Sequence, residues 1–422
     1  MSPATRTSGA ARSGSTTPGP SAVADATTEP ARSPWDGRLA VLAVMLGIFS
    51  IVTTEILPIG LLTAIGADFG ISDGTAGLMM TTPGVLAALA APTVTVATAR
   101  IDRRLMLCAF VLLLALANFL AAAATAYWLV LLSRIMVGIT IGGFWSIGAG
   151  LAERLVRPEA VGRATAVIFS AVPLGSVLGV PAGTFIGDLA GWRTAFVVMG
   201  AVAVGVFVLM AVVTPALPAR QLTRPRVLRE VLRRTPTRFA LLMTFLIVLA
   251  HFGAYTYVTP FLEQVTHLAS PGLVTVFLLT YGAAGIAGNF LGGATVARLP
   301  RATFGTAAAL LAAATLLLPL LGRGAWGALA LLIVWGIAYG AVPVSSQTWF
   351  VKAAPDAPEA ASVLFTASFQ ATISLGALVG GVALDHTSPS TVMTLGGATA
   401  VLVALTAWLH FAGRHDWQRG ND

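Results

Sequence analysis

The chain has 422 residues, of which 56% are hydrophobic and only 10% are charged, and its mean hydropathy is +0.85. Soluble domains carry about 25% charged residues, so this composition excludes a water-soluble fold and indicates an integral membrane protein. The net charge of +8 would suggest nucleic-acid binding in a soluble domain, but here we expect membrane topology to explain it and no nucleic acid to bind.

The first 36 residues are rich in Ser, Thr, Pro, Gly and Ala and show no apolar periodicity. Such a composition predicts a disordered cytosolic tail over residues 1–36. The first hydrophobic stretch is too long for a secretory signal and lacks a small-residue cleavage context, so we expect it to remain in the mature protein as a helix.

Apolar segments of roughly 20 residues or more recur along the chain, each long enough to cross about 30 Å of hydrocarbon as a helix. They predict an all-α membrane protein with twelve transmembrane helices. The predicted spans are 39–65, 74–98, 104–124, 127–151, 161–185, 193–215, 239–262, 272–296, 302–321, 326–350, 360–383 and 390–411. The predicted domains are an N-terminal six-helix half at 37–216, a basic cytosolic linker at 217–238, a C-terminal six-helix half at 239–412 and a cytosolic tail at 413–422.

Basic residues orient the predicted bundle. When alternate loops are assigned to opposite sides, Arg193 and Arg323 are the only basic residues in the outer loops, and Arg134 lies within a span. The positive-inside rule then places both termini in the cytoplasm. The basic linker carries an amphipathic piece that we expect to lie on anionic lipid, although a site for a regulatory partner is an alternative.

The two halves repeat each other in sequence. Gly138 and Gly142 recur as Gly336 and Gly340 at an offset of 198, and Pro58 in the first span matches Pro260 in the seventh. These pairings occur in order along the chain, so they indicate two parallel six-helix pseudo-repeats. Folds of that type enclose a central cavity with the substrate near the midplane.

Glu55 is the one carboxylate in the apolar run from Leu39 to Ile65. A charge near the bilayer centre costs at least ~2.5 to 3.5 kcal/mol on insertion scales, so a buried carboxylate indicates a proton or substrate site. At 1.5 Å per helical residue, Arg134 lies about 10 Å and Glu55 about 16 Å from the outer surface, so the two can share a depth. They are then either a proton-coupling pair or a static structural pair.

The fifth span is dense in residues that bend helices or allow close packing: Pro173, Gly175, Gly179, Pro181 and Gly183. Proline removes a helical hydrogen bond, and small residues let helices approach closely, so we expect this span to take part in gating. Ordinary helix packing is the alternative.

Polar and aromatic side chains on several spans are candidates for substrate binding. Aromatic faces and amides can stack on and bond to a nucleobase or a sugar ring, whereas the alternative roles are interfacial anchoring and helix contacts. The candidates are Trp145, His251, Tyr255, Tyr257, Asn289, Gln347 and Gln370.

Several short motifs are informative when taken together: the Arg-rich loop after the second span, Arg134-x-x-x-Gly138, Thr54-Glu55-Ile56-Leu57-Pro58, Gly142-Gly143-Phe144-Trp145, Gly191-Trp192-Arg193, Trp335-Gly336 and Val342-Pro343-Val344. With these motifs the chain resembles the major facilitator superfamily, in its drug:proton antiporter branch. The narrower motifs are similar to those of bacterial exporters of sugars and purine ribonucleosides.

The resemblance implies roles for particular residues. Arg134 matches a motif implicated in proton coupling, the fifth span resembles the antiporter signature, and Asp102 with Arg100, Arg103 and Arg104 matches a loop that latches the cytoplasmic helix ends. Both glycines of the usual loop pattern are missing here. A solvated loop that serves topology alone is the alternative to a latch.

The sequence therefore predicts a proton-coupled secondary transporter that exports a small organic molecule, a sugar, nucleoside or drug, by alternating access. An importer or uniporter of a small polar metabolite is the alternative. We expect a functional monomer in the bacterial inner membrane, with protons, lipid and the substrate as its partners.

Catalysis is not expected, since the sequence shows no cofactor motif, metal-ligand cluster or nucleophile elbow. The lone Cys108 excludes an intrachain disulfide, and Lys352 lies in no phosphate-binding loop. We therefore expect no cofactor and no metal, and energy must come from a gradient or a separate subunit.

Overall fold

The computed structural model describes residues 34–97, 101–148, 151–218, 225–268, 270–296 and 298–419, and all regular secondary structure in these ranges is helical. Among these described residues, twelve helical segments are long and apolar enough to cross a membrane, which confirms the twelve predicted spans. Some continue past the predicted ends; the fifth runs over Pro158–Ala190 rather than 161–185. Hydropathy falls where polar residues begin, but the helical hydrogen bonding continues beyond that point.

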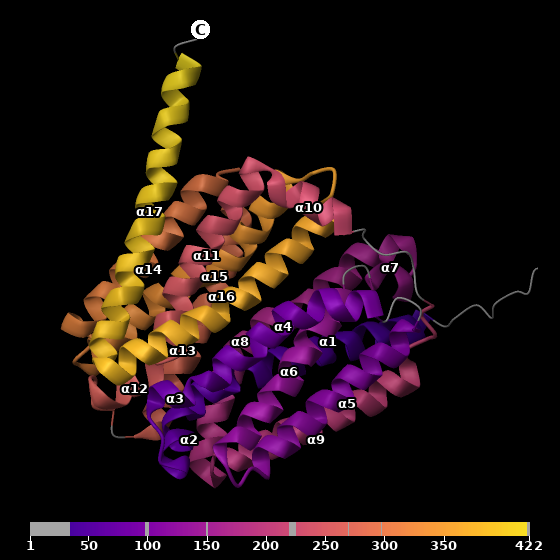
Figure 1. The fold of residues 1–422 in the computed structure, drawn as a ribbon, viewed down its shortest axis with the longest axis horizontal. Coiled ribbons are helices and arrows are strands. Elements are labelled where there is room, and N and C mark those ends of the chain that lie inside the picture. The colour runs from indigo at the N-terminus through magenta and orange to yellow at the C-terminus, as the bar shows by residue number, and fades with distance from the viewer. Residues whose placement is uncertain are drawn as a thin grey trace, which may run out of the picture. The chain divides into compact units, whose positions relative to one another are not determined.

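The first six spans are built from helices drawn from indigo to magenta (Figure 1). They are α1 (Pro34–Ile56), η1 (Leu57–Leu61), α2 (Leu62–Phe69), α3 (Asp73–Ala76), α4 (Leu78–Ala97), α5 (Arg103–Ala122), α6 (Tyr127–Gly148), α7 (Ala152–Leu155), η2 (Pro158–Ala160), α8 (Val161–Ala190) and α9 (Trp192–Val213).

A short helix of the linker and the last six spans follow, drawn toward orange and yellow (Figure 1). They are α10 (Pro225–Arg233), α11 (Thr235–Tyr255), α12 (Val258–Gln264), α13 (Pro271–Val296), α14 (Pro300–Leu321), α15 (Ala325–Ala353), α16 (Pro358–His386) and α17 (Pro389–Arg419).

The first and seventh spans are both interrupted at the positions that the sequence repeat pairs. The α-helix of the first span ends at Ile56 and continues as the 3₁₀ segment η1, which contains Pro58. In the seventh span, α11 ends at Tyr255 and α12, with Pro260, resumes at Val258. A proline has no N–H and its ring clashes with the carbonyl four residues earlier, so it favours such a break.

The paired glycines of the repeat have the same structural role in both halves. Gly138 and Gly142 lie where α6 crosses α4, and a Cβ on Gly142 would come within 2.8 Å of the backbone N of Ala91. Gly336 and Gly340 lie where α15 crosses α13, and a Cβ on Gly340 would come within 3.0 Å of the backbone N of Asn289. These glycines therefore allow close helix contact in each half.

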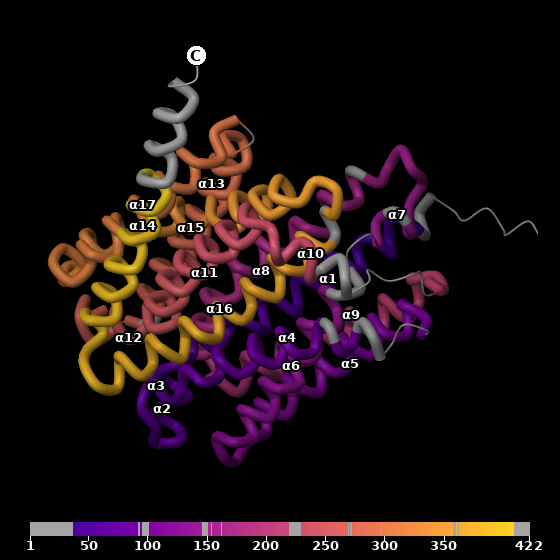
Figure 2. Tube along the Cα trace, turned by 45° about the horizontal axis from the view of Figure 1, so that its top comes forward, coloured from indigo at the N-terminus to yellow at the C-terminus, as the bar shows by residue number. Residues whose placement is uncertain are grey.

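The most extensive packing between the halves is that of α4 against α16 and of α8 against α13 (Figure 2). Residues from Pro34 onward form one unit by their contacts, so the predicted domain borders stay predictions. The end of the bundle with the turns at Gly70, Gly191 and Thr387 is called the outer end below, and the opposite end the inner end, after the predicted orientation.

Candidate proton and substrate site

Glu55 forms a contact between the two halves of the bundle. It lies one residue before the end of α1, and its side chain is only 7% exposed. Its Oε1 accepts a hydrogen bond of 2.9 Å from Nε2 of Gln370 on α16. The structure thus brings together two residues that the sequence named for different roles, one for protons and one for substrate.

Arg134 on α6 is fully buried beside the same stretch of α1. Its Nη1 donates a hydrogen bond of 2.9 Å to the backbone oxygen of Thr54, a carbonyl left free because Pro58 lacks an N–H. Its guanidinium carbon lies 5.2 Å from the centroid of the Phe196 ring. Arg134 therefore bonds to the residue before Glu55 and acts on the carboxylate electrostatically, and its coupling role stays a prediction.

Asn118 on α5, which was not among the predicted site residues, also contacts Thr54. Its Nδ2 donates to Oγ1 of Thr54 at 3.2 Å and to the backbone oxygen of Leu114 at 2.9 Å. Its Oδ1 has no partner within the described ranges, nor do Nε and Nη2 of Arg134. An amide inside the third apolar span was the signal that could have identified it.

His251 and Tyr255, both predicted to bind substrate, lie together in an aromatic cluster of the second half. Their rings stack at 5.1 Å, and the cluster also includes Tyr281, Trp335 and Tyr339. Sequence patterns did not indicate these three residues as part of a site. These rings lie close together because α11, α13 and α15 pack against one another, and a hydropathy pattern carries no information about helix packing.

The other predicted substrate residues lie apart from this group. Tyr257 is fully buried and donates a hydrogen bond of 2.6 Å to the backbone oxygen of Ala377. Trp145 packs against Phe169 at 6.1 Å, Asn289 is half-buried and Gln347 is exposed. In the part of the chain that the structure describes, no hydrogen bond or ring contact joins Trp145, Asn289 or Gln347 to Glu55.

At the inner end, Asp102 caps α5 and connects it to the segment after α9. Its carboxylate accepts hydrogen bonds from the backbone N–H of Arg104 at 2.7 Å and of Leu217 at 3.1 Å. Nη2 of Arg104 donates to the backbone oxygen of Ala211 at 2.5 Å, and Arg103 is buried. Arg100 lies outside the described residues, so the predicted latch stays a prediction.

The glycines of the fifth span face the first span. A Cβ on Gly179 would lie 2.8 Å from Cγ1 of Ile56, and one on Gly183 would lie 2.9 Å from Cδ1 of Leu57. Gly175 faces Val52 in the same manner, and Pro173 and Pro181 both lie inside α8. This face of α8 therefore packs on the helix that carries Glu55, and its part in gating stays a prediction.

Hydrogen bonds link the two halves at the outer end. Asp385 of α16 accepts hydrogen bonds from the hydroxyl of Ser72 at 2.8 Å and from the backbone N–H of Gly74 at 3.0 Å. Gln264 Nε2 donates to Asp73 at 3.2 Å. Together with a bond of 3.0 Å from the Thr259 hydroxyl to the backbone oxygen of Ile59, these contacts connect the two halves at the outer end around the break in the first span.

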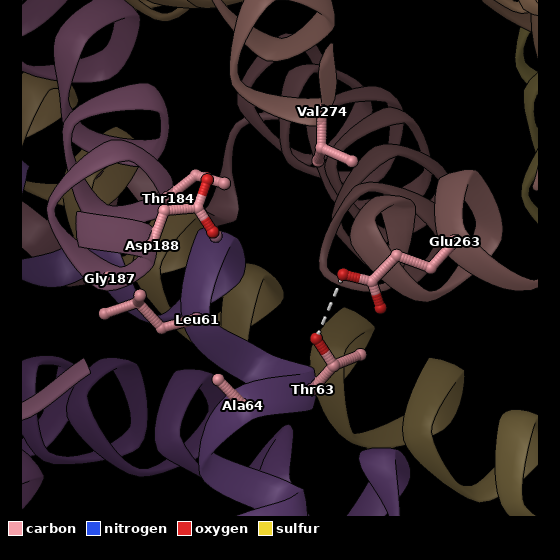
Figure 3. Close-up of a pocket in the computed structure, with 9 residues that line it drawn as sticks. Leu61, Thr63, Ala64, Thr184, Gly187, Asp188, Glu263 and Val274 are labelled. Carbon is pink, nitrogen blue, oxygen red and sulfur yellow. Dashed lines mark hydrogen bonds between the residues drawn. The ribbon is translucent and has the colours of Figure 1, made fainter. Parts of the chain in front are cut away.

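A pocket of about 330 Å³ lies at the outer end, between η1, α2 and α8 of the first half and α12 and α13 of the second (Figure 3). Glu263 accepts a hydrogen bond of 3.3 Å from the Thr63 hydroxyl at its edge. The pocket contains none of the predicted substrate residues. Its lining residues are Gly60, Leu61, Thr63, Ala64, Thr184, Gly187, Asp188, Glu263 and Val274.

Twelve spanning helices with a buried carboxylate and a buried guanidinium between them define a multi-pass membrane protein with a polar centre. Residues 43–365 match the Major Facilitator Superfamily. The chain belongs to this superfamily of transporters.

Curated relatives extend the match over most of the chain. The chain is 32% identical over 368 residues to the purine ribonucleoside efflux pump NepI of Escherichia coli O6:K15:H31 (strain 536 / UPEC), covering 87% of this chain and 92% of that protein. It is 32% identical over 384 residues to the protein of the same name in Escherichia coli (strain K12), covering 90% and 95%. The relatives are transporters, not enzymes, by their names.

Solved structures share the fold. A bacterial homolog to the human lysosomal transporter Spinster, in an inward-facing and occupied conformation, has a TM-score of 0.74 at 18% identity and covers 90% of this chain and 97% of that one. The human organic anion transporter MFSD10 (TETRAN) has a TM-score of 0.67 at 18% identity, covering 89% and 100%. At this identity the likeness concerns the fold alone.

Proposed function

We propose that this protein exports a small organic molecule in exchange for protons, and that Glu55 carries the proton. The observation that supports this most is the bond from Gln370 to Glu55, because it places a titratable group at a contact between the two halves. The protonation state of Glu55 then directly affects this contact between the two halves.

The chemistry of the carboxylate gives the exchange its two states. A charged Glu55 needs a donor such as Gln370, the field of Arg134 or water, since burial of an unpaired charge is costly. A protonated Glu55 has no net charge and loses most of that cost. Protonation therefore favours the closed arrangement around Glu55, and deprotonation favours a hydrated one.

Alternating access follows from these two states. In the outward-facing state, water reaches Glu55 and the carboxylate takes up a proton. Reorientation of the two halves then exposes Glu55 to the inside, where the proton leaves. The deprotonated, inward-facing protein binds the substrate for export. The proton gradient then supplies the energy for substrate export, and no ATP is needed. The two halves, 37–216 and 239–412, are proposed to move as units, with the fifth span and the Asp102 loop as gating elements.

The substrate class is proposed from the relatives. Their printed name is that of purine ribonucleoside efflux pumps, and they match this chain over nearly its whole length. We propose a purine ribonucleoside as the exported molecule, and a multi-pass location in the bacterial inner membrane with both termini cytoplasmic. The concentration of arginines in the predicted inner loops supports this orientation.

The test uses proteoliposomes loaded with radiolabelled inosine and an imposed pH gradient. The wild-type protein is expected to accelerate nucleoside movement against the proton flow, whereas Glu55→Gln, which keeps the shape but cannot titrate, should lose this pH-driven transport. Normal pH-driven transport by Glu55→Gln rejects the assignment of Glu55. Inosine transport that no pH gradient accelerates indicates a uniporter instead.

A further inference from the structure

Four aromatic rings of the second half form a stack that continues across three helices. His251 and Tyr339 lie face to face, with centroids 3.3 Å apart and planes at 6°. Tyr255 stacks on His251 at 5.1 Å and on Tyr281 at 4.5 Å. The indole of Trp335 meets His251, Tyr255 and Tyr281 edge-on at 78° to 83°.

The tyrosine hydroxyls separate this cluster from an ordinary core. The chain has five tyrosines. Tyr127 and Tyr257, outside the cluster, donate their hydroxyls to backbone carbonyls at 2.8 and 2.6 Å. In the cluster, Tyr255 and Tyr281 are each only 6% exposed, yet neither hydroxyl has a partner among the described residues, and the same holds for Tyr339.

Fully buried polar atoms without a partner occur elsewhere in the described residues, but none of these three hydroxyls is among them, so each hydroxyl reaches accessible space. Polar groups in proteins are almost always hydrogen-bonded, so three hydroxyls without a protein partner on three stacked rings leave room for a partner from outside the chain, either water or a ligand. Because these residues come from α11, α13 and α15, the donors arise independently on three helices and converge in one place. A tightly filled core would instead use phenylalanine here, which leaves no polar group to satisfy.

Trp335 fixes the tautomer of His251 within the stack. Its Nδ1 accepts a hydrogen bond of 3.1 Å from Nε1 of Trp335, and an indole N–H can only donate. Nδ1 therefore carries no proton, and the proton of the neutral imidazole is on Nε2. The Trp335 contact thus sets the tautomer of a ring that is itself part of the stack.

Tyr339 is the accessible end of the stack, next to the proton site. It is half-buried, whereas His251, Tyr255, Tyr281 and Trp335 are buried. It also lies close enough to Glu55 for the two to interact electrostatically. A flat ligand stacked on Tyr339 would therefore lie within electrostatic range of the carboxylate that the proposed exchange uses.

We propose that this cluster binds the heteroaromatic base of the transported molecule: the base stacks on the face of Tyr339 that His251 does not cover, and tyrosine hydroxyls of the cluster donate to its ring nitrogens and carbonyl oxygen. A purine offers several such acceptors on one flat ring, whereas a sugar has no π-face to stack. The choice of a purine as the ligand rests on the proposed function. The preference for a flat ring with several hydrogen-bond acceptors rests on the aromatic cluster alone.

The experiment measures equilibrium binding of tritiated inosine to the full-length protein in detergent, with no pH gradient. Tyr281→Phe and Tyr339→Phe keep the rings and remove one donor each, and we expect each to weaken inosine binding about fivefold. Tyr339→Leu removes the stacking face and should weaken binding by about 5- to 150-fold. Tyr127→Phe is the matched control and should bind as the wild type does.

Competition tests which part of the ligand is recognised. Unlabelled hypoxanthine should displace inosine, and D-ribose should not. Equal inosine affinity in Tyr281→Phe, Tyr339→Phe and the wild type overturns the proposal, as does displacement by D-ribose alone or an absence of inosine binding to the wild type. Thermal unfolding of each variant confirms that the comparison is between folded proteins.

The outcomes also separate this inference from the proposed function. Inosine binding that depends on Tyr281 and Tyr339, without pH-driven transport in proteoliposomes, supports the binding site and rejects proton exchange. Inosine transport that depends on Glu55 but not on these tyrosines supports proton exchange and rejects the binding site.

Discussion

Gly179→Val tests whether close packing between α8 and α1 is needed for transport. A Cβ at Gly179 would lie 2.8 Å from Cγ1 and 3.0 Å from Cδ1 of Ile56, and 3.3 Å from Cα of Thr53, where ordinary contacts are 3.4–4 Å. Valine adds two further methyl groups, so α8 must move away from the segment next to Glu55. Overpacking of this kind costs about 1–3 kcal/mol, which corresponds to roughly a 5- to 150-fold change in a conformational equilibrium.

Gly205→Val on α9 is the matched control, because a Cβ there meets nothing within 4 Å. Both substitutions exchange the same residues in a helix, so their difference isolates the contact with α1. We expect both variants to insert in the membrane, but Gly179→Val to unfold at a lower temperature and to lose most nucleoside transport in proteoliposomes. Equal melting temperature and transport in the two variants would refute the reasoning.

Two further predictions concern polar contacts. Arg234 donates hydrogen bonds of 2.5 and 2.7 Å to Asp356 and lowers the pKa of that carboxyl from 3.8 to about 2, so the pair is fully present above its ordinary pKa and is lost as pH falls through about 2. Asp356→Asn should therefore loosen the linker at neutral pH, seen as faster trypsin cleavage within residues 225–238; unchanged cleavage would speak against this. In Asn118→Asp, the new carboxylate should pair with the unpartnered nitrogens of Arg134, which should raise the melting temperature and slow transport. Asn118→Leu, which offers no polar group, should lower the melting temperature. A shift of the melting temperature in the same direction in both variants would contradict the proposed pairing with Arg134.

Hydropathy was sufficient to predict all twelve spans, because apolar length is what a bilayer selects. The repeat also predicted a shared feature of the first and seventh spans, and both are interrupted next to Pro58 and Pro260. It did not predict that the break frees the carbonyl of Thr54 for Arg134. That consequence depends on which helix lies beside the break, and a linear pattern does not contain it.

The candidate site was predicted in part. Glu55 and Arg134 could be recognised because a charge in an apolar span is costly, and Gln370 because amides are rare there. The sequence did not indicate Tyr281, Trp335 and Tyr339, because aromatic residues are common in apolar spans. Their arrangement depends on contacts between residues far apart in the sequence, such as His251 and Trp335, which are separated by 84 positions. Polarity alone also does not say which face of a helix a residue occupies, so Gln347 was grouped with residues that it does not contact.

The central claim is that Glu55 carries the proton that is exchanged for substrate. The most direct measurement uses proteoliposomes with an entrapped pH indicator, in which an inosine gradient is the only driving force. Wild-type protein is expected to move protons opposite to inosine, while Glu55→Gln should exchange labelled for unlabelled inosine without moving protons. Proton movement by Glu55→Gln equal to that of the wild type, or none by either protein during inosine transport, would contradict the account.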